Sequence, residues 1–187
     1  MRYWIYLLLI TLAGCVNDLA EVNQLFEQAE TGTEVAKDIE MLYSDSAVVR
    51  VRIIGPTLIR YLEGDKPRDE FPDGVHVDFL EEDGSVNSTL DAQYAERFTR
   101  ENLVIVRSNL NDGIPVILKN NRGEKLETSE LIWDEGDSKV YTDKFVKITK
   151  PEEIIFAYGF TANQDFSQYT LQKVVGRVKV DDNEFKN

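Results

Sequence analysis

Short runs in which apolar and polar residues alternate dominate the chain from Ser44 onward. Residues 49–53 and 75–79 alternate with a period of two. Because successive side chains of a strand point to opposite faces, this pattern predicts half-buried β-strands. Further β-rich runs cover residues 103–106, 114–118, 131–133, 139–142, 145–148, 154–158 and 169–180. Residues 87–102 fit either a helix or strands, and the β-branched and aromatic residues in them favour strands.

Pairs ending in glycine separate these runs and often recur about ten residues apart, as in Asp73-Gly74 and Asp83-Gly84. Glycine supplies the positive φ angles that tight hairpins require. This rhythm is typical of an antiparallel sandwich or barrel, so we expect an all-β fold. An open antiparallel β-jelly roll would bury one face of each sheet and leave edge strands free to pair with other chains.

The first fifteen residues have the pattern of a secretory leader. Arg2 precedes an apolar run of about ten residues, which is too short to span a bilayer. The single cysteine of the chain, Cys15, follows Leu12-Ala13-Gly14, which resembles a bacterial lipobox. We therefore expect a leader over residues 1–14 and a lipid anchor at Cys15. The alternative is a free cysteine in a short uncleaved anchor helix.

Residues 15–43 are polar and acidic and are expected to form a tether, with one weak helix possible over residues 17–29. The β-domain is then predicted to cover residues 44–181, followed by a short tail over residues 182–187.

Composition excludes several classes of function. The chain has 187 residues, with 21 basic and 34 acidic side chains and a formal net charge of −13. This argues against a general nucleic-acid binder, which needs a basic face. One cysteine and one histidine, His76, exclude a disulfide framework and a site with several histidine ligands for a metal. His76 is expected to face solvent between Val75 and Val77.

No sequence motif indicates catalysis or a cofactor. The acidic turn before Gly84 lacks the ligand spacing of a calcium loop, since Phe79 and Leu90 fall at ligand positions. The chain contains no phosphate-binding loop and no nucleophile elbow. We expect no enzyme activity, no cofactor and no metal.

Several segments taken together, in order and spacing, resemble the LptC family, the periplasmic component of lipopolysaccharide export, in its Bacteroidetes-type form. They are residues 36–39, 43–46, 55–56, 60–61, 71–75, 88–95, 126–134, 141–143, 158–160 and 165–169. The resemblance spans residues 36–177. It departs from many relatives, which have a transmembrane helix in place of the lipobox.

The resemblance implies an open β-jelly roll whose apolar interior holds the acyl chains of lipopolysaccharide. It also implies that one sheet edge docks on the inner-membrane ABC transporter and the other on the bridge protein LptA. The protein would be non-catalytic and held at the periplasmic side of the inner membrane by Cys15.

The groove candidates are the residues expected to point inward from each strand. They are Val51, Ile53, Val77, Phe79, Val104, Val106, Val116, Leu118, Leu131, Trp133, Val146, Ile148, Ile154 and Phe156. Periodicity alone does not distinguish a closed core from a groove. Burying a methylene is worth about 0.8 kcal/mol, so acyl chains in transit must stay in an apolar environment.

Tyr158 and Gly159 are the partner-docking candidates, because the resemblance places a Tyr-Gly pair in the region that contacts the bridge protein. We expect Gly159→Arg to weaken that docking without unfolding the domain. The alternative for Gly159 is an ordinary turn. The alternative function is a β-sandwich lipoprotein that binds carbohydrate or a protein partner, with Trp133 and Tyr141 as exposed aromatic candidates.

Overall fold

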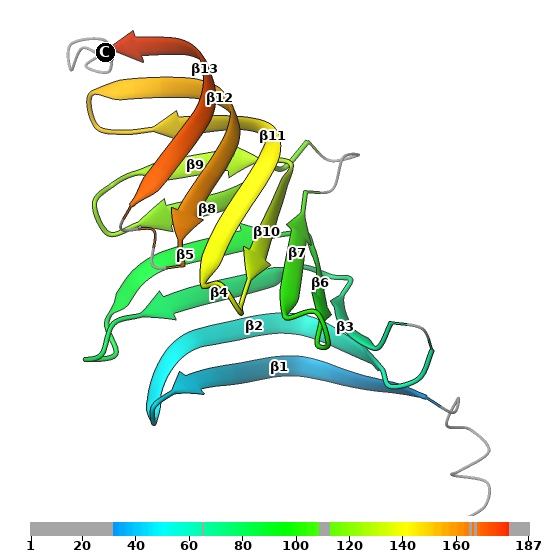
Figure 1. Cartoon of the computed structure of the whole chain (residues 1–187). Coiled ribbons are helices and arrows are strands. Elements are labelled where there is room, and N and C mark those ends of the chain that lie inside the picture. The colour runs from blue at the N-terminus through cyan, green and yellow to red at the C-terminus, as the bar shows by residue number, and fades with distance from the viewer. Residues whose placement is uncertain (1–31, 65, 109–112, 165, 167, 180–187) are drawn as a thin grey trace, which may run out of the picture. The chain divides into compact units, whose positions relative to one another are not determined.

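The computed structural model describes residues 32–64, 66–108, 113–164, 166 and 168–179. Gly32 begins the compact unit that contains the sheet. Over these residues the chain is all-β and forms one large antiparallel sheet, consistent with an LptC-like β-jelly roll (Figure 1). The leader, Cys15 and the possible helix over residues 17–29 lie outside the described residues.

The described residues form thirteen strands in chain order. They are β1 (Thr33–Asp45), β2 (Val48–Tyr61), β3 (Arg68–Phe71), β4 (Val75–Leu80), β5 (Val86–Ala92), β6 (Tyr94–Phe98), β7 (Leu103–Arg107), β8 (Val116–Asn120), β9 (Lys125–Thr128), β10 (Glu130–Asp134), β11 (Lys139–Thr149), β12 (Glu153–Asn163) and β13 (Tyr169–Lys179). Residues 87–102 contain most of β5, all of β6 and the turn before β7, so the strands that their composition favoured are confirmed.

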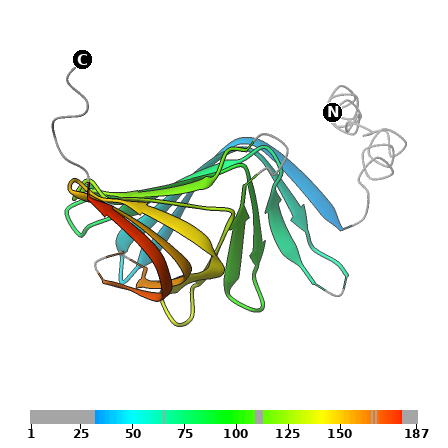
Figure 2. The same cartoon turned by 90° about the horizontal axis from the view of Figure 1, so that it is seen from above.

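Two layers of strands diverge from one edge of β2 and converge on one edge of β11. One layer is β4-β5-β8-β9 and the other is β3-β6-β7-β10. The first half of β2 pairs with β4, and its last residues pair with β3. Likewise β11 pairs with β10 at its start and with β9 at its end. Figure 2 shows the two layers from above, with their strands running in different directions.

From β4 to β9 the chain places two consecutive strands in one layer and the next two in the other, so short corners carry it across. Pro72-Asp73-Gly74 joins β3 to β4 in this way. Gly74 has φ +95°, and a Cβ there would lie 3.0 Å from the carbonyl oxygen of Ala92. A larger residue would therefore be strained at this corner, both by its backbone and by contact. The glycine turns predicted from sequence at Gly74 and Gly84 both lie between strands.

The outermost strands extend the sheet beyond the two layers. β1 pairs along the whole outer edge of β2, and β12 and β13 follow β11 in order. The strand β1 corrects the predicted tether over residues 15–43, because residues 33–43 belong to the sheet. The domain therefore begins near Gly32 and not at Ser44. The acidic residues of this segment hid its alternation, in which Ile39 and Met41 pack against the core.

Candidate functional site

The space between the two layers is apolar and almost filled by side chains. A cavity of about 30 Å³ remains, lined by residues of both layers, including Val77, Leu90, Val106 and Leu131. That is about the volume of one water molecule, far below the roughly 150 Å³ that accommodates a benzene ring. The interior as it stands is a packed core with a narrow residual void.

Most of the predicted groove residues meet in this interior. One continuous cluster contains Val51, Val77, Phe79, Val104, Val106, Val116, Leu118, Leu131, Trp133, Val146 and Ile148, and Ile53 packs against it. The structure therefore confirms that these side chains point inward. That they contact acyl chains remains a prediction.

Two of the predicted inward residues, Ile154 and Phe156, point to the outer face instead. Val146 and Ile148 are inward, and their cross-strand partners on β12 are Ala157 and Ile155. Directly paired residues of neighbouring strands share a face, so the inward residues of β12 are the odd-numbered ones here. Residues 154–158 are apolar throughout, so their sequence carries no alternation from which the phase could be chosen.

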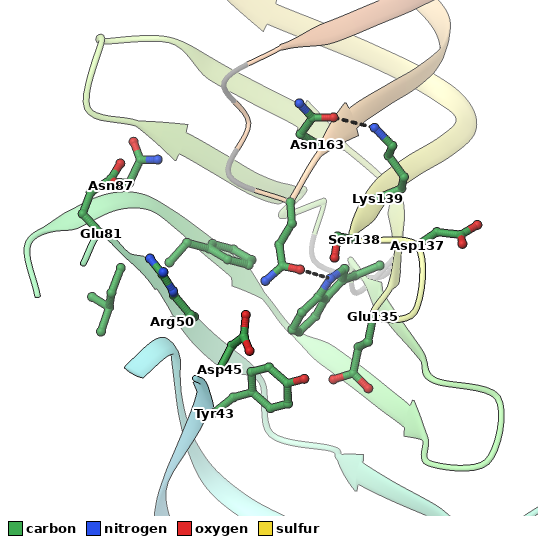
Figure 3. A pocket seen from close by; sticks show the side chains of 14 residues that line it. Tyr43, Asp45, Arg50, Glu81, Asn87, Glu135, Asp137, Ser138, Lys139 and Asn163 are labelled. Atoms are coloured by element: carbon green, nitrogen blue, oxygen red, sulfur yellow. Dashed lines mark hydrogen bonds between the residues drawn. The ribbon is translucent and has the colours of Figure 1, made fainter. Parts of the chain in front are cut away.

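One end of the interior opens into a pocket of about 520 Å³ (Figure 3). We call it the mouth pocket. Its lining comes from seven strands and from nearby turns: Tyr43, Asp45, Arg50, Phe79, Leu80, Glu81, Asn87, Trp133, Glu135, Asp137, Ser138, Lys139, Asn163 and Gln164. The rim is mainly polar, and it carries four carboxylates against two cationic side chains.

Phe79 and Trp133 separate the mouth pocket from the interior cavity, since both residues line both spaces. Their rings meet edge to face at 5.9 Å, and Phe166 packs on Phe79 at 5.4 Å. The Trp133 Nε1 atom donates a hydrogen bond to Gln164 Oε1 at 3.3 Å. The aromatic rings thus form a barrier between the polar rim and the apolar interior.

Arg97 is the charged side chain among the described residues that line the interior cavity. Its guanidinium contacts Glu135 through Nε at 3.1 Å and through Nη2 at 3.1 Å. The Glu135 side chain is only 9% exposed. Arg97 and Glu135 therefore neutralise each other's charge at the end of an apolar space.

The two docking candidates lie in different surroundings. Tyr158 is 48% exposed on the outer face, where it packs edge to face on Phe145 at 5.5 Å. Gly159 is buried and has φ +80°, and a Cβ there would lie 2.8 Å from the Gln172 side chain. Gly159→Arg would therefore strain the strand, which corrects the expectation that this change spares the fold.

Trp133 does not form the exposed platform that the carbohydrate alternative requires, because it is only 8% exposed. His76 lies on the outer face of β4, as expected, but it is only partly exposed and is held by two carboxylates. Nδ1 lies 2.7 Å from Asp91 Oδ1, and Nε2 lies 3.1 Å from Asp78 Oδ1.

Comparison with protein families matches residues 101–178 to a family described as lipopolysaccharide-assembly, LptC-related. Over this segment, which is 78 of the 187 residues, the chain is similar to LptC-related proteins. The matched region runs from the turn before β7 into β13, and it includes Trp133 and the strands β11 and β12. This relationship supports a role in lipopolysaccharide transport, in which LptC is a non-catalytic component. Among curated proteins, no match to the chain was found.

Sequence reasoning missed most of the mouth pocket. Arg50, Glu135, Lys139 and Gln164 come from strand ends and turns, where alternation does not predict which side chains converge. The order of neighbouring strands decides that, and it is a property of the topology. In the part of the chain that the structure describes, no helix has the length and apolarity needed to cross a membrane.

Proposed function

We propose that this chain receives lipopolysaccharide from the inner-membrane ABC transporter, holds its acyl chains between the two layers, and passes it to an LptA-type bridge protein. The observation that carries the proposal is the arrangement of two connected spaces. The mouth pocket opens to the outside, and the apolar interior lies behind it, separated from it only by the rings of Phe79 and Trp133. The relationship to LptC supports the choice of ligand.

Loading would require the two layers to part, because the residual cavity is too small for an acyl chain. Short ladders connect the layer β3-β6-β7-β10 to the rest of the sheet. It is joined to β2 through three residue pairs and to β11 through three more. Few backbone hydrogen bonds therefore oppose a displacement of this layer. Each acyl methylene that enters the interior contributes about 0.8 kcal/mol toward the cost of parting.

The two ends of the sheet supply the docking edges. β1 pairs only with β2, and β13 pairs only with β12, among the described strands. A partner strand can be added at each end by backbone hydrogen bonds. We assign the transporter and the bridge protein to these two edges, with Tyr158 near the bridge-protein edge.

The anchor and location belong to the same proposal. We propose that Cys15 is lipidated after removal of residues 1–14 and holds the domain on the periplasmic side of the inner membrane. Cys15→Ala should abolish metabolic labelling of the protein with radioactive palmitate. Unchanged labelling would contradict a lipid anchor at this residue.

A photo-crosslinking amino acid in place of Phe79 tests the conduit in growing cells, and Tyr43 at the pocket rim provides a second position that leaves the core intact. Crosslinks to lipopolysaccharide are expected from both. The same probe at Phe145, a phenylalanine on the outer face, is the matched control and should give none. Crosslinks from Phe79 and Tyr43 only to protein or glycan would contradict the conduit and favour a carbohydrate-binding or protein-binding lipoprotein.

A further inference from the structure

The mouth pocket is where the sugars of a bound lipid would lie, because it opens outward from the apolar interior that holds acyl chains in the proposed function. Its volume of about 520 Å³ is ordinary for a small-ligand site, for which about 300–1,000 Å³ is usual. The charges at its rim therefore bear on which headgroups it accepts.

Three carboxylates of the rim are not neutralised by a cation. Asp45, Glu81 and Asp137 form no ion pair with any described residue, whereas Glu135 is compensated by Arg97. The three come from separate parts of the chain: the end of β1, the turn after β4 and the turn between β10 and β11. Figure 3 shows these carboxylates at different points around the pocket. A headgroup in the pocket would thus meet negative charge from several directions.

The two cations of the rim do little to offset this charge. Arg50 Nη2 contacts Glu82 Oε1 at 2.8 Å, so the Arg50 charge is already compensated. Lys139 Nζ donates a hydrogen bond to Asn163 Oδ1 at 2.5 Å, and because this partner is neutral, the Lys139 charge remains. One uncompensated cation against three uncompensated carboxylates leaves a surplus of two negative charges at the rim.

This surplus favours sugar hydroxyls and amides over phosphates. A phosphate monoester carries about −1.5 to −2 charges at pH 7, and its binding sites usually supply arginine or lysine donors or converging backbone N–H groups. Hydroxyl and amide groups instead donate hydrogen bonds to carboxylate oxygens, such as those of Asp45 and Glu81. The Tyr43 ring, which is 44% exposed, adds apolar surface at the same rim.

We propose that the mouth pocket receives the sugar part of the lipid and selects headgroups with few phosphates over headgroups with several. The proposal rests on the proposed function, because it names the part of the same ligand that this pocket takes. Several like charges act together on each added phosphate, so the preference should be large at low salt and small where salt screens the charges.

Competition between two lipids tests this preference. Both are forms of lipid A, the lipid part of lipopolysaccharide, with identical acyl chains and either one or two phosphates. A chelator removes divalent cations, which could bridge phosphate to carboxylate. A photo-crosslinking residue replaces Tyr43 in the purified full chain, and mass spectrometry measures the crosslinks to each lipid. The form with one phosphate should give about tenfold more crosslinks at low salt, and the ratio should approach one at 1 M salt, where the Debye length is about 3 Å.

Neutral variants of the rim then test whether its carboxylates cause the preference. Asp45→Asn, Glu81→Gln and Asp137→Asn, combined in one chain, should lower the ratio at low salt to about two or less.

The matched control combines Glu34→Gln, Asp143→Asn and Glu152→Gln, which remove the same amount of charge from exposed positions outside the pocket. This control should keep the tenfold ratio, and circular dichroism and thermal unfolding verify that both variants fold. Equal crosslinking of the two lipids by the unmodified rim, or an equal loss of preference in the control, would overturn the proposal and leave the proposed function standing. Absence of crosslinks to either lipid would contradict both.

Discussion

The strands β4 and β12 both bury one face against the core, yet their outer faces differ completely. On β4, Val75, Val77 and Phe79 point inward, while His76 and Asp78 point outward into a polar network. On β12, Ile155 and Ala157 point inward, while Ile154, Phe156 and Tyr158 cover the outer face with apolar surface.

The comparison explains why sequence predicted one strand correctly and the other with the wrong phase. In β4 the polar residues mark the outer face, so alternation fixes which residues are buried. In β12 both faces are apolar, and only the pairing with β11 reveals the phase. Burial therefore has to be tested residue by residue on β12.

The largest expected effect separates two adjacent isoleucines on opposite faces of β12. Ile155 is 3% exposed, so Ile155→Ala should lower the free energy of unfolding by about 2–5 kcal/mol through lost burial and a cavity. Ile154→Ala, its matched control on the outer face, should lower it by less than about 1 kcal/mol. Urea unfolding of both variants measures the difference, and equal losses would contradict the assigned phase.

A smaller loss of stability is expected at Gly159, where the inward-pointing positions of β12 change from odd-numbered to even-numbered residues. Inward residues are odd-numbered before Gly159 and even-numbered after it, at Phe160 and Ala162. Gly159→Ala should cost about 1–3 kcal/mol, because φ +80° is unfavourable for alanine and the new Cβ meets Gln172. Adding Gln172→Ala to Gly159→Ala should recover only the part of the stability loss that comes from the contact with Gln172. Full stability of Gly159→Ala would show that this kink imposes no strain.

The polar outer face of β4 should respond less strongly. Asp78 accepts hydrogen bonds from Arg52 Nε at 2.9 Å and from Arg52 Nη2 at 2.7 Å, and its side chain is 6% exposed. Asp78→Asn should lower stability by about 1–2 kcal/mol, since the exposed part of Arg52 stays hydrated. Asp91→Asn, at a more exposed carboxylate, serves as the comparison and should cost less. A larger loss in Asp91→Asn would contradict this order.

The smallest expected effect is a dependence on pH at His76. Burial lowers the pKa of His76, but hydrogen bonds and negative charge from Asp91 and Asp78 outweigh it, so the pKa is raised overall. The stabilisation is therefore fully present below the unfolded pKa of about 6.5 and is lost as pH rises through the higher folded value. The stability difference between the unmodified chain and His76→Gln should be larger at pH 5.5 than at pH 8.5, by less than about 1 kcal/mol. A difference that grows with pH would reverse the assignment.

Sequence was sufficient for the all-β class, the glycine turns and most inward residues, because these depend on local alternation. It was insufficient for β1, whose Ile39 and Met41 alternate within an acidic segment, and for the convergence of Arg50, Trp133 and Gln164 at the mouth pocket. Strand addition to β2 and the order of the layers are long-range properties. The resemblance to LptC supplied the expected fold and ligand, and the family match covers its C-terminal part.

Nine strands lead from β1 to β13 through the layer β4-β5-β8-β9, and every neighbouring pair is antiparallel. An odd number of alternating strands gives the first and the last the same sense in the ladder, although the twist of the sheet turns them to different orientations in space. A strand added antiparallel to β1 and a strand added antiparallel to β13 would therefore also share one sense with each other, so the sheet can be extended at both ends without interrupting its alternation.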